Sequence, residues 1–314
     1  MVGIIATEAL TKEYGGARGI NDVTLAVNEG EIFGFLGPNG AGKTTTIRTL
    51  MGVLRPTGGR ATIAGLDCWS QATAIKAFVG YLPGEFTFDP NLTGAQILTY
   101  LGNLRGGADQ AQIRRLAERL ELDLSKRFRQ YSRGNKQKVG LVQAFMHPPP
   151  LLILDEPTGG LDPLNQQTFY DLVREANQGG TSVFVSSHIL PEIEHLCQRV
   201  GIIREGRLIT VDQVAALKDI KQHVVEVTFP APASVAWFDK LPGVSATTID
   251  DGGRALRLTV QGDLRDILPI AARHNATNLI SREPSLEEIF LRFYTPDGEQ
   301  RPPTGAQPSS ARAS

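Results

Sequence analysis

A glycine-rich segment that ends in a lysine and a threonine is the first place where residue type and spacing indicate chemistry. It comprises Gly37, Pro38, Asn39, Gly40, Ala41, Gly42, Lys43 and Thr44, and Thr45 opens the helical pattern that follows. This order fits the phosphate-binding pattern G-x-x-x-x-G-K-[ST]. In such a loop, backbone N–H groups surround a phosphate, Lys43 reaches the β- and γ-phosphate oxygens, and Thr44 offers a hydroxyl to Mg²⁺. A plain glycine turn is the alternative, but the predicted strand before the segment and the helix after it favour a nucleotide site.

Two adjacent acids form a second candidate site. Asp155 and Glu156 directly follow the apolar run Leu151–Leu154. Because a buried parallel strand delivers its last residues to the edge where a phosphate loop sits, we expect both carboxylates near the nucleotide. Asp155 would hold Mg²⁺ through its water shell, and Glu156 would polarise the attacking water as a general base. Solvated acids in a loop are the alternative interpretation.

The elements that must position these residues are predicted by short apolar runs. Four such runs, each bounded by turn residues, predict buried strands at Glu31–Leu36, Leu151–Leu154, Ser182–Ser186 and Val200–Ile203. They alternate with helical patterns, which predicts an α/β fold with a parallel sheet. Between about residues 71 and 150 the pattern is mainly helical, with an amphipathic helix over Gln110–Leu122. We interpret 71–150 as a helical insertion within a nucleotide-binding domain at 1–220.

A second, smaller domain is predicted after residue 220. Strand patterns at Val224–Phe229 and Ala255–Val260, with a helical pattern over Asp263–His274, predict an α+β domain at 221–296. The stretch 297–314 is rich in Pro, Ser, Ala and Gly, so we expect a disordered tail there. A length of 314 residues accommodates two domains.

The composition limits the compartment and the partners. Hydrophobic residues make up 41% of the chain and charged residues 21%, as in soluble globular proteins. Lysine and arginine number 32 against 33 acids, and this near-neutral balance argues against nucleic acid as a partner. The chain has two cysteines, no secretory leader and no run of about 18 apolar residues. These features predict a cytoplasmic protein that does not itself cross a membrane.

A third motif places these features in a recognisable order. Tyr131–Lys138 opens a predicted helix immediately upstream of the acidic strand. The order of phosphate loop, helical insertion, Ser-x-Gly segment and Asp-Glu strand resembles the ATP-binding-cassette (ABC) family over about residues 4–220. The resemblance implies a P-loop NTPase that hydrolyses ATP with Mg²⁺ and whose nucleotide-binding domains pair head to tail. Ser132 and Gly134 would then close over the ATP held by the second subunit.

The same resemblance assigns three further residues. Tyr14 lies where the family stacks an aromatic ring on adenine, Asp162 lies in the segment that crosses the dimer interface, and His188 is similar to the switch histidine at the γ-phosphate. The implied catalytic set is Glu156, His188 and Lys43.

The chain also departs from the common family pattern. Gly84, followed by Glu85, stands where a glutamine is usual, so either Glu85 replaces that side chain or the backbone does the sensing. Tyr131, Arg133 and Asn135 surround the Ser-x-Gly residues. This variant is similar to ABC-2-type exporters of the daunorubicin- and bacitracin-resistance kind.

The resemblance implies the motor of an exporter, peripheral on the cytoplasmic face of the cell membrane. It would drive efflux of a drug, antibiotic or lipid-like substrate through a separate integral-membrane permease that docks near Pro83–Asn91, with Phe86 and Phe88. The segment Ser285–Leu291 resembles the closing helix of the extra C-terminal domain in these exporters. An importer ATPase, or a non-transport cassette acting on ribosomes or DNA, is the alternative. A single phosphate loop and the absence of extended heptads argue against the non-transport class.

Overall fold

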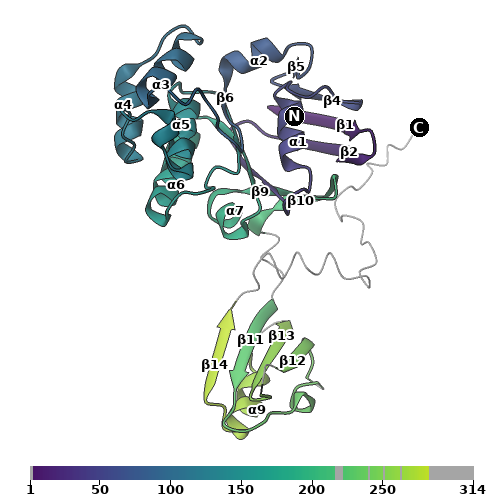
Figure 1. Cartoon of the computed structure of the whole chain (residues 1–314). Coiled ribbons are helices and arrows are strands. Elements are labelled where there is room, and N and C mark those ends of the chain that lie inside the picture. Colours follow the sequence, from purple (N-terminus) through teal and green to yellow (C-terminus); the bar gives the residue numbers. More distant parts are fainter. Residues whose placement is uncertain (1–2, 216–221, 240, 250–251, 262–263, 283–314) are drawn as a thin grey trace, which may run out of the picture. The chain divides into compact units, whose positions relative to one another are not determined.

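The chain divides into two compact units, unit 1 at Met1–Ala216 and unit 2 at Leu217–Ser314 (Figure 1). The computed structural model describes residues 3–215, 222–239, 241–249, 252–261 and 264–282. The sequence analysis placed the domain boundary after residue 220. Each unit has its own cluster of buried apolar side chains, so each is described by itself.

The centre of unit 1 is a six-stranded sheet with the strand order β10-β9-β3-β8-β7-β6. Its strands are β3 (Ile32–Leu36), β6 (Val79–Leu82), β7 (Leu151–Asp155), β8 (Ser182–Ser187), β9 (Arg199–Arg204) and β10 (Arg207–Gln213). All pair in parallel except β10, which pairs antiparallel with β9 at one edge. Every residue of β3, β7 and β8 is buried, as expected for strands covered on both faces. The predicted α/β fold with a parallel sheet is confirmed.

A second sheet of unit 1 is antiparallel and has the order β2-β1-β4-β5. It contains β1 (Ile5–Tyr14), β2 (Ala17–Val27), β4 (Gly58–Ile63) and β5 (Leu66–Asp67). The sequence analysis did not predict this sheet. The reason lies in its register shifts, such as the one between Thr7 and Leu10 in β1, which interrupt the alternation of buried and exposed residues.

The main core of unit 1 lies between the two sheets. Helix α1 (Lys43–Leu50) contacts β2, β4 and β7, and its Ile47 and Leu50 join Phe35 of β3 and Ile63 of β4 in one buried cluster. Burying such apolar surface is the dominant favourable term in folding. This packing therefore holds the start of α1, where the phosphate loop ends, against the sheet.

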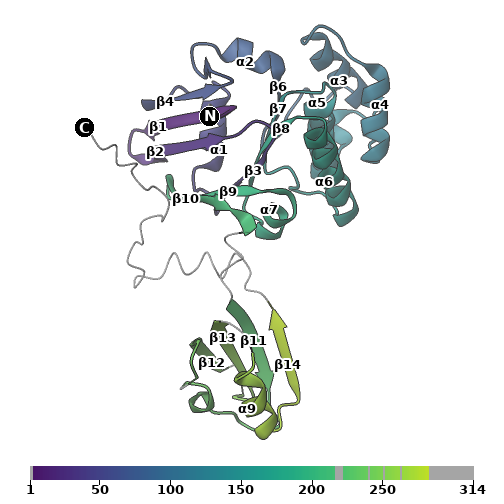
Figure 2. The same ribbon diagram turned by 180° about the vertical axis from the view of Figure 1, so that it is seen from behind.

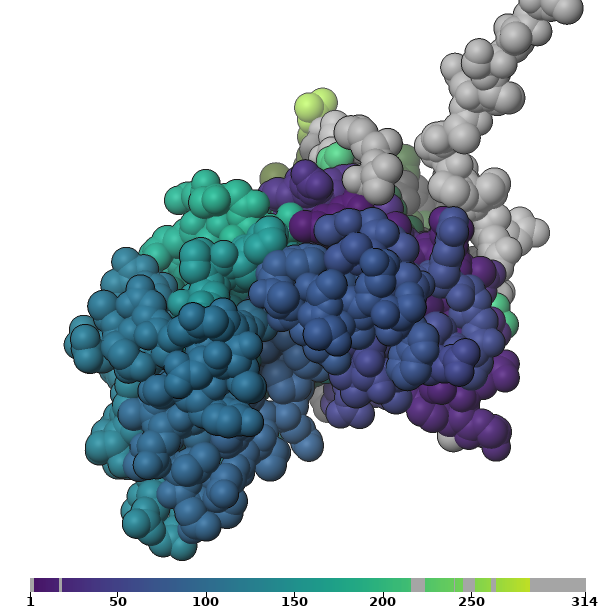
Figure 3. Space-filling model, turned by 90° about the horizontal axis from the view of Figure 1, so that it is seen from above, coloured from purple at the N-terminus to yellow at the C-terminus, as the bar shows by residue number. Residues whose placement is uncertain are grey.

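Helices cover the other face of the six-stranded sheet (Figure 2). Helix α5 (Arg133–Phe145) contacts β6, α6 (Pro163–Gln178) contacts β8, and α7 (Leu190–Leu196) contacts β3 and β8. Helices α3 (Gly94–Asn103) and α4 (Gln110–Arg119) pack on α5. Helices α3, α4 and α5, together with α2 (Ala72–Phe78) and the short 3₁₀ helix Phe128–Gln130, lie within the predicted helical insertion. In the space-filling view the blue-to-teal helical region projects from the body of the unit (Figure 3).

Unit 2 is an antiparallel sheet with a helix. The strands β11 (Gln222–Thr228), β12 (Val244–Ile249), β13 (Ala255–Gln261) and β14 (Asn278–Arg282) have the order β12-β13-β11-β14. Helix α9 (Ile267–Arg273) and the 3₁₀ helix Val235–Trp237 complete the unit. Its core contains Phe229, Phe238 and Leu258. The predicted segments Ser285–Leu291 and 297–314 lie outside the described residues.

Membrane-spanning helices were also sought in the structure. Within the described part of the chain, no helix combines the length and the apolar composition that crossing a bilayer requires.

Candidate active site

Three loops of unit 1 meet at one edge of the six-stranded sheet. The phosphate loop follows β3, Glu156 follows β7 and His188 follows β8. β8 lies between β3 and β7, and the register pairs Leu36, the last residue of β3, with Ser187 of β8. Because parallel strands end at the same edge, residues far apart in the sequence become neighbours.

The path of the phosphate loop depends on its glycines. Gly40 and Gly42 have φ angles of +78° and +111°, in the left-handed region that favours glycine. A Cβ atom on Gly37 would lie 2.3 Å from the Ile203 carbonyl oxygen, so no larger residue fits there. Residues 38–40 are exposed, and no side chain caps the start of α1. The first N–H groups of this helix are therefore available to an anion such as a phosphate.

Lys43 is a buried cation at the base of this loop. Its side chain is 5% exposed, and Nζ donates to the carbonyl oxygens of Gly37 (2.6 Å) and Pro38 (3.1 Å). The same nitrogen lies 3.1 Å from Glu156 Oε1. The structure thus brings together two of the three residues predicted to be catalytic.

The third, His188, meets Glu156 from the other side. His188 Nδ1 lies 2.7 Å from Glu156 Oε2, and the side chains of Glu156 and His188 are 24% and 44% exposed. Glu156 has a φ of +50°, which is uncommon for a residue with a Cβ atom. Its backbone N–H donates to the Ser186 carbonyl oxygen at 3.2 Å, which holds this turn against β8.

Asp155 offers a buried oxygen that suits a cation. The residue is fully buried, and its Oδ1 accepts a hydrogen bond from Ser186 Oγ at 2.6 Å. Its Oδ2 is buried and, among the described residues, accepts no hydrogen bond. Magnesium prefers carboxylate and other oxygen ligands. Asp155 and Thr44, which lies in the first turn of α1, therefore form a donor set that fits Mg²⁺.

Two residues that support the site were missed by the sequence analysis. Ser186 bonds Asp155, as described above. Gln137 is 6% exposed, and its Nε2 donates to the carbonyl oxygens of Glu156 and Pro157, both at 3.1 Å. It therefore joins α5 to the turn that carries Glu156. The sequence signal that could have identified both residues is a polar side chain within a segment predicted to be buried, a strand for Ser186 and a helix for Gln137.

Ser132, Gly134 and Asp162 have structural roles within the chain itself. Ser132 Oγ accepts from Asn135 N–H at 3.2 Å and caps α5. Asp162 Oδ1 accepts from Asn165 N–H at 3.0 Å and caps α6, and the hydrogen bonds from Asn165 lower the pKa of Asp162. Within the described residues, no hydrogen bond or ion pair joins these three residues to Lys43 or Glu156. Both caps leave their acidic or hydroxyl groups exposed at a helix start.

Gly134 packs against the loop that follows Glu156. A Cβ atom there would lie 2.3 Å from the Gly160 carbonyl oxygen, so the close approach of the two backbones requires glycine. Tyr14, at the end of β1, is 41% exposed, and Lys12 Nζ lies 5.5 Å from the centre of its ring. An exposed ring is available for stacking on a flat ligand.

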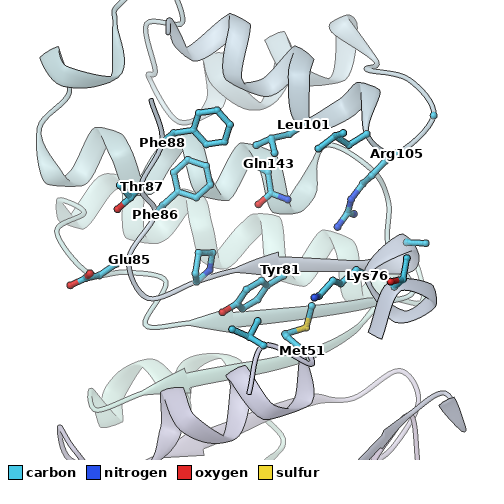
Figure 4. Close-up of a pocket in the computed structure, with 16 residues that line it drawn as sticks. Met51, Lys76, Tyr81, Glu85, Phe86, Thr87, Phe88, Leu101, Arg105 and Gln143 are labelled. Carbon is cyan, nitrogen blue, oxygen red and sulfur yellow. The ribbon is translucent and has the colours of Figure 1, made fainter. Parts of the chain in front are cut away.

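Gly84, which stands where a glutamine is usual, faces Asp155. A Cβ atom on Gly84 would lie 3.1 Å from Asp155 Oδ2. Glu85 is exposed and points outward at the rim of a neighbouring cavity (Figure 4). The backbone at Gly84 is therefore placed beside the candidate metal ligand.

That cavity has a volume of about 790 Å³ and lies between the sheet and the helical region. Phe86 and Phe88 stack at its side with ring centres 6.3 Å apart, and Tyr81 and Lys76 lie across from them (Figure 4). Several of its lining residues belong to Pro83–Asn91, the segment near which the sequence analysis predicted that a permease docks. An open cavity lined mainly by apolar side chains suits a protein segment.

The fold, together with the residues at the sheet edge where the loops after β3, β7 and β8 meet, defines a class of protein, the ABC-type P-loop ATPases. The family model for ABC transporters matches residues 20–159, which include the phosphate loop and both acids. The bacitracin transport ATP-binding protein BcrA of Enterococcus faecalis is 37% identical over 68% of this chain and 70% of its own length. The daunorubicin resistance ATP-binding protein DrrA3 of Streptomyces coeruleorubidus is 32% identical over 92% of this chain and 95% of its own length. The chain belongs to the ABC transporter ATP-binding family.

Solved structures agree with this assignment. One described as an ATP-binding subunit of an ABC transporter is 30% identical, with a TM-score of 0.63, and the match covers 68% of this chain and 92% of that chain. The predicted ABC cassette fold, and the activity of an ATP-binding and ATP-hydrolysing subunit, are thereby confirmed.

Proposed function

We propose that this protein is the ATP-hydrolysing subunit of an exporter and powers efflux of an antibiotic or another drug through a separate permease. The observation that carries the ATPase site is the position of Glu156, whose carboxylate lies between Lys43 (3.1 Å) and His188 (2.7 Å) at the sheet edge. The relatives named for bacitracin transport and daunorubicin resistance support an antibiotic as cargo, and resistance supports efflux as the direction.

ATP would supply the γ-phosphoryl group that is transferred to water, and bound Mg²⁺ would neutralise charge on the phosphates. The phosphate loop 37–44 would hold the triphosphate, with Thr45 in the same helical turn. Thr44 and Asp155 would hold Mg²⁺, and Tyr14 would stack on the base. Asp155 Oδ2, which is buried and accepts no hydrogen bond from the described residues, supports the metal assignment.

Glu156 is proposed to accept a proton from the attacking water, with His188 fixing its carboxylate and Lys43 binding the phosphates. In the structure Lys43 contacts Glu156, so a triphosphate entering the loop competes for the same ammonium group. Occupation of the loop would therefore release Glu156 toward the water. A positioned general base contributes about 10²–10⁴-fold to a rate.

Two subunits are proposed to pair head to tail. Ser132 and Gly134 at the start of α5 would contact ATP held by the second subunit, and Asp162 would lie at the interface. The exposed Leu164, at 77%, supports an interface beside Asp162, because large apolar side chains favour burial.

The Glu156→Gln variant tests the ATPase site. We expect ATP binding to persist while turnover falls about 10²–10⁴-fold, because the amide cannot take the proton. ATP affinity and phosphate release would be measured together. The control is Glu118→Gln, which changes an exposed acid in α4 and should leave turnover unchanged. Near-normal turnover in Glu156→Gln would remove Glu156 from this role.

The permease partner is tested by co-expression with a candidate membrane subunit. Phe88 lines the cavity, so Phe88→Ala should reduce co-purification with the permease while leaving ATP hydrolysis by the isolated protein unchanged. Trp69→Ala is the control, since Trp69 is 44% exposed and does not line the cavity. If the wild-type protein neither co-purifies with the permease nor is stimulated by it, the transport assignment fails. Uptake in place of efflux in vesicles would identify the importer alternative.

A further inference from the structure

A buried acid lies behind the proposed site and has no part in the roles assigned above. Glu192 belongs to α7 and is 2% exposed. Its Oε2 accepts a hydrogen bond from Ser187 Oγ at 2.5 Å. Ser187 Oγ in turn accepts from Ile189 N–H at 2.9 Å. The residues on both sides of His188 are therefore tied, directly or through Ser187, to the Glu192 carboxyl group.

Glu192 also faces the loop that carries Glu156. Thr158, two residues after Glu156, is 4% exposed, and its hydroxyl favours the charged form of Glu192 as the Ser187 hydroxyl does. Glu192 Oε1 is buried and, within the described residues, accepts no hydrogen bond that satisfies ordinary geometry. One carboxyl group thus lies between the loops that follow β7 and β8.

Burial of this acid is unfavourable in itself. Among the described residues, no lysine or arginine forms an ion pair with Glu192, and burial raises its pKa to about 7. An apolar residue of similar size at this position would not carry the unfavourable desolvation of a buried carboxyl group. Acids with perturbed pKa values of this kind cluster at functional sites.

We propose that Glu192 is a positioning residue for ATP hydrolysis, which holds the His188 turn against the Glu156 loop through Ser187. The inference rests on the proposed roles of Glu156 and His188. The His188 side chain is 44% exposed and its 2.7 Å contact with Glu156 lies at the surface of the site, so packing around the ring fixes it only in part. The direction of the ring is then set by the backbone of its turn, and that backbone is held from below by Ser187 and Glu192.

Hydrolysis and ATP binding by Glu192→Ala, Glu192→Gln and Ser187→Ala test this proposal. Glu192→Ala should lower kcat about 10–100-fold, the loss that a small misplacement of reacting groups causes, and should leave ATP affinity within twofold of wild type. Glu192→Gln should keep kcat within threefold, because its amide oxygen can still accept from Ser187. Ser187→Ala should lower kcat as Glu192→Ala does, and combining the two changes should cost little more than either alone.

Two further variants separate positioning from general loss of structure. Glu194→Ala removes an acid from the same helix at a less buried position and should keep wild-type kcat. His188→Ala should abolish the effect of Glu192→Ala, since Glu192 is proposed to act through His188. Circular dichroism and thermal unfolding would establish that each variant is folded, and Ser187→Ala carries the test if Glu192→Ala is not.

Several results would overturn the proposal. Wild-type kcat in folded Glu192→Ala, a parallel fall in ATP affinity, or an equal loss in Glu194→Ala would each do so. A Glu192→Gln variant as slow as Glu192→Ala would exclude positioning by the hydrogen bond. Wild-type kcat in His188→Ala would overturn the proposed role of His188 itself, and with it this inference. If His188→Ala lowers kcat but Glu192→Ala does not, the inference about Glu192 is overturned while the proposed role of His188 stands.

Discussion

At the residue scale, the ion pair between Lys43 and Glu156 joins the phosphate loop to the proposed base. Lys43 is 5% exposed, and two carbonyl oxygens and one carboxylate oxygen surround its ammonium group. A cation held in this way binds an incoming phosphate without ordering a flexible side chain first. We therefore expect Lys43 to contribute more to ATP affinity than a surface lysine would.

Replacing Lys43 by Ala should weaken ATP binding by about 10–100-fold, because a hydrogen bond to a charged group contributes roughly 1.5–3 kcal/mol. Titration calorimetry or a fluorescent nucleotide would measure the affinity. Arg48→Ala is the control: it removes the same charge from an exposed position of α1 and should change affinity little. Unchanged ATP affinity in Lys43→Ala would contradict the assignment of the phosphate loop.

Glu192 should also make the stability of unit 1 depend on pH. Its pKa is about 7 in the folded chain against an ordinary value of 4.5, so the folded form holds a proton that the unfolded form has lost between these values. This contribution to stability is fully present below pH 4.5 and is lost as the pH rises through about 7. The groups that face Glu192 are Glu156, His188, Tyr170 and Cys197.

Comparison of the wild type with Glu192→Gln isolates this effect, because the other four groups are common to both proteins. The free energy of unfolding of the wild type, relative to the variant, should fall by up to about 1.4 kcal/mol per pH unit within this window. Urea unfolding at several pH values would measure it. Parallel pH profiles for the two proteins would show that Glu192 does not titrate there.

At the element scale, backbone packing and hydrogen bonds join α5 to the turn after β7. The start of α5 carries Ser132 and Gly134, Gly134 packs on Gly160, and Gln137 donates to the carbonyl oxygens of Glu156 and Pro157. We therefore expect a shift of α5 to move the backbone of Glu156. The start of α5 and the proposed base Glu156 are thus linked through the backbone of the Glu156 turn.

Gln137→Ala should lower the free energy of unfolding by about 1–3 kcal/mol, because two buried carbonyl groups lose their side-chain donor. It should also lower turnover, since the Glu156 turn loses its connection to α5. Gln167→Ala is the matched control: Gln167 is exposed on α6, and surface changes of this kind stay within about 0.5 kcal/mol. Equal stability of the two variants in thermal unfolding would show that the Gln137 hydrogen bonds are dispensable.

At the scale of the whole molecule, two separate cores indicate two units of stability. The core of unit 1 lies between its two sheets, and the core of unit 2 surrounds Phe238, which is fully buried. The residues proposed to bind ATP all belong to unit 1. Unfolding of unit 2 should therefore leave nucleotide binding intact.

Phe238→Ala should destabilise unit 2 by about 3–5 kcal/mol, the cost of removing a buried aromatic ring, and leave ATP affinity unchanged. Calorimetry should then show the unfolding of unit 2 shifted to lower temperature, with the ATP-stabilised transition in place. Phe169→Ala, at a fully buried position of α6, is the reciprocal control and should lower the ATP-stabilised transition. A single transition that moves as a whole in Phe238→Ala would show that the units unfold together.

The predictable part of this protein consists of features that are local in the sequence. The buried strands were predicted because each is a short, nearly continuous apolar run, and the phosphate loop because its glycines and Lys43 have fixed spacing. The antiparallel sheet was not predicted because register shifts such as the one between Thr7 and Leu10 break its alternation. Gln137 was missed because its partners, the carbonyl groups of Glu156 and Pro157, lie 19 and 20 residues away in the sequence. Glu192 was missed because its partner Ser187, 5 residues away, comes into contact with it only in the folded chain.

The sequence alone determined the class of fold and predicted phosphate binding by residues 37–44, since both follow from local composition and spacing. The tertiary structure decided which groups act together. The order β3-β8-β7 brings the ends of these three strands to one edge of the sheet, where Lys43 and His188 lie on either side of the Glu156 carboxylate. The structure also decided that a buried acid, Glu192, lies beneath the His188 turn. Such contacts depend on the order of strands in the sheet, and that order is set by packing across the whole unit.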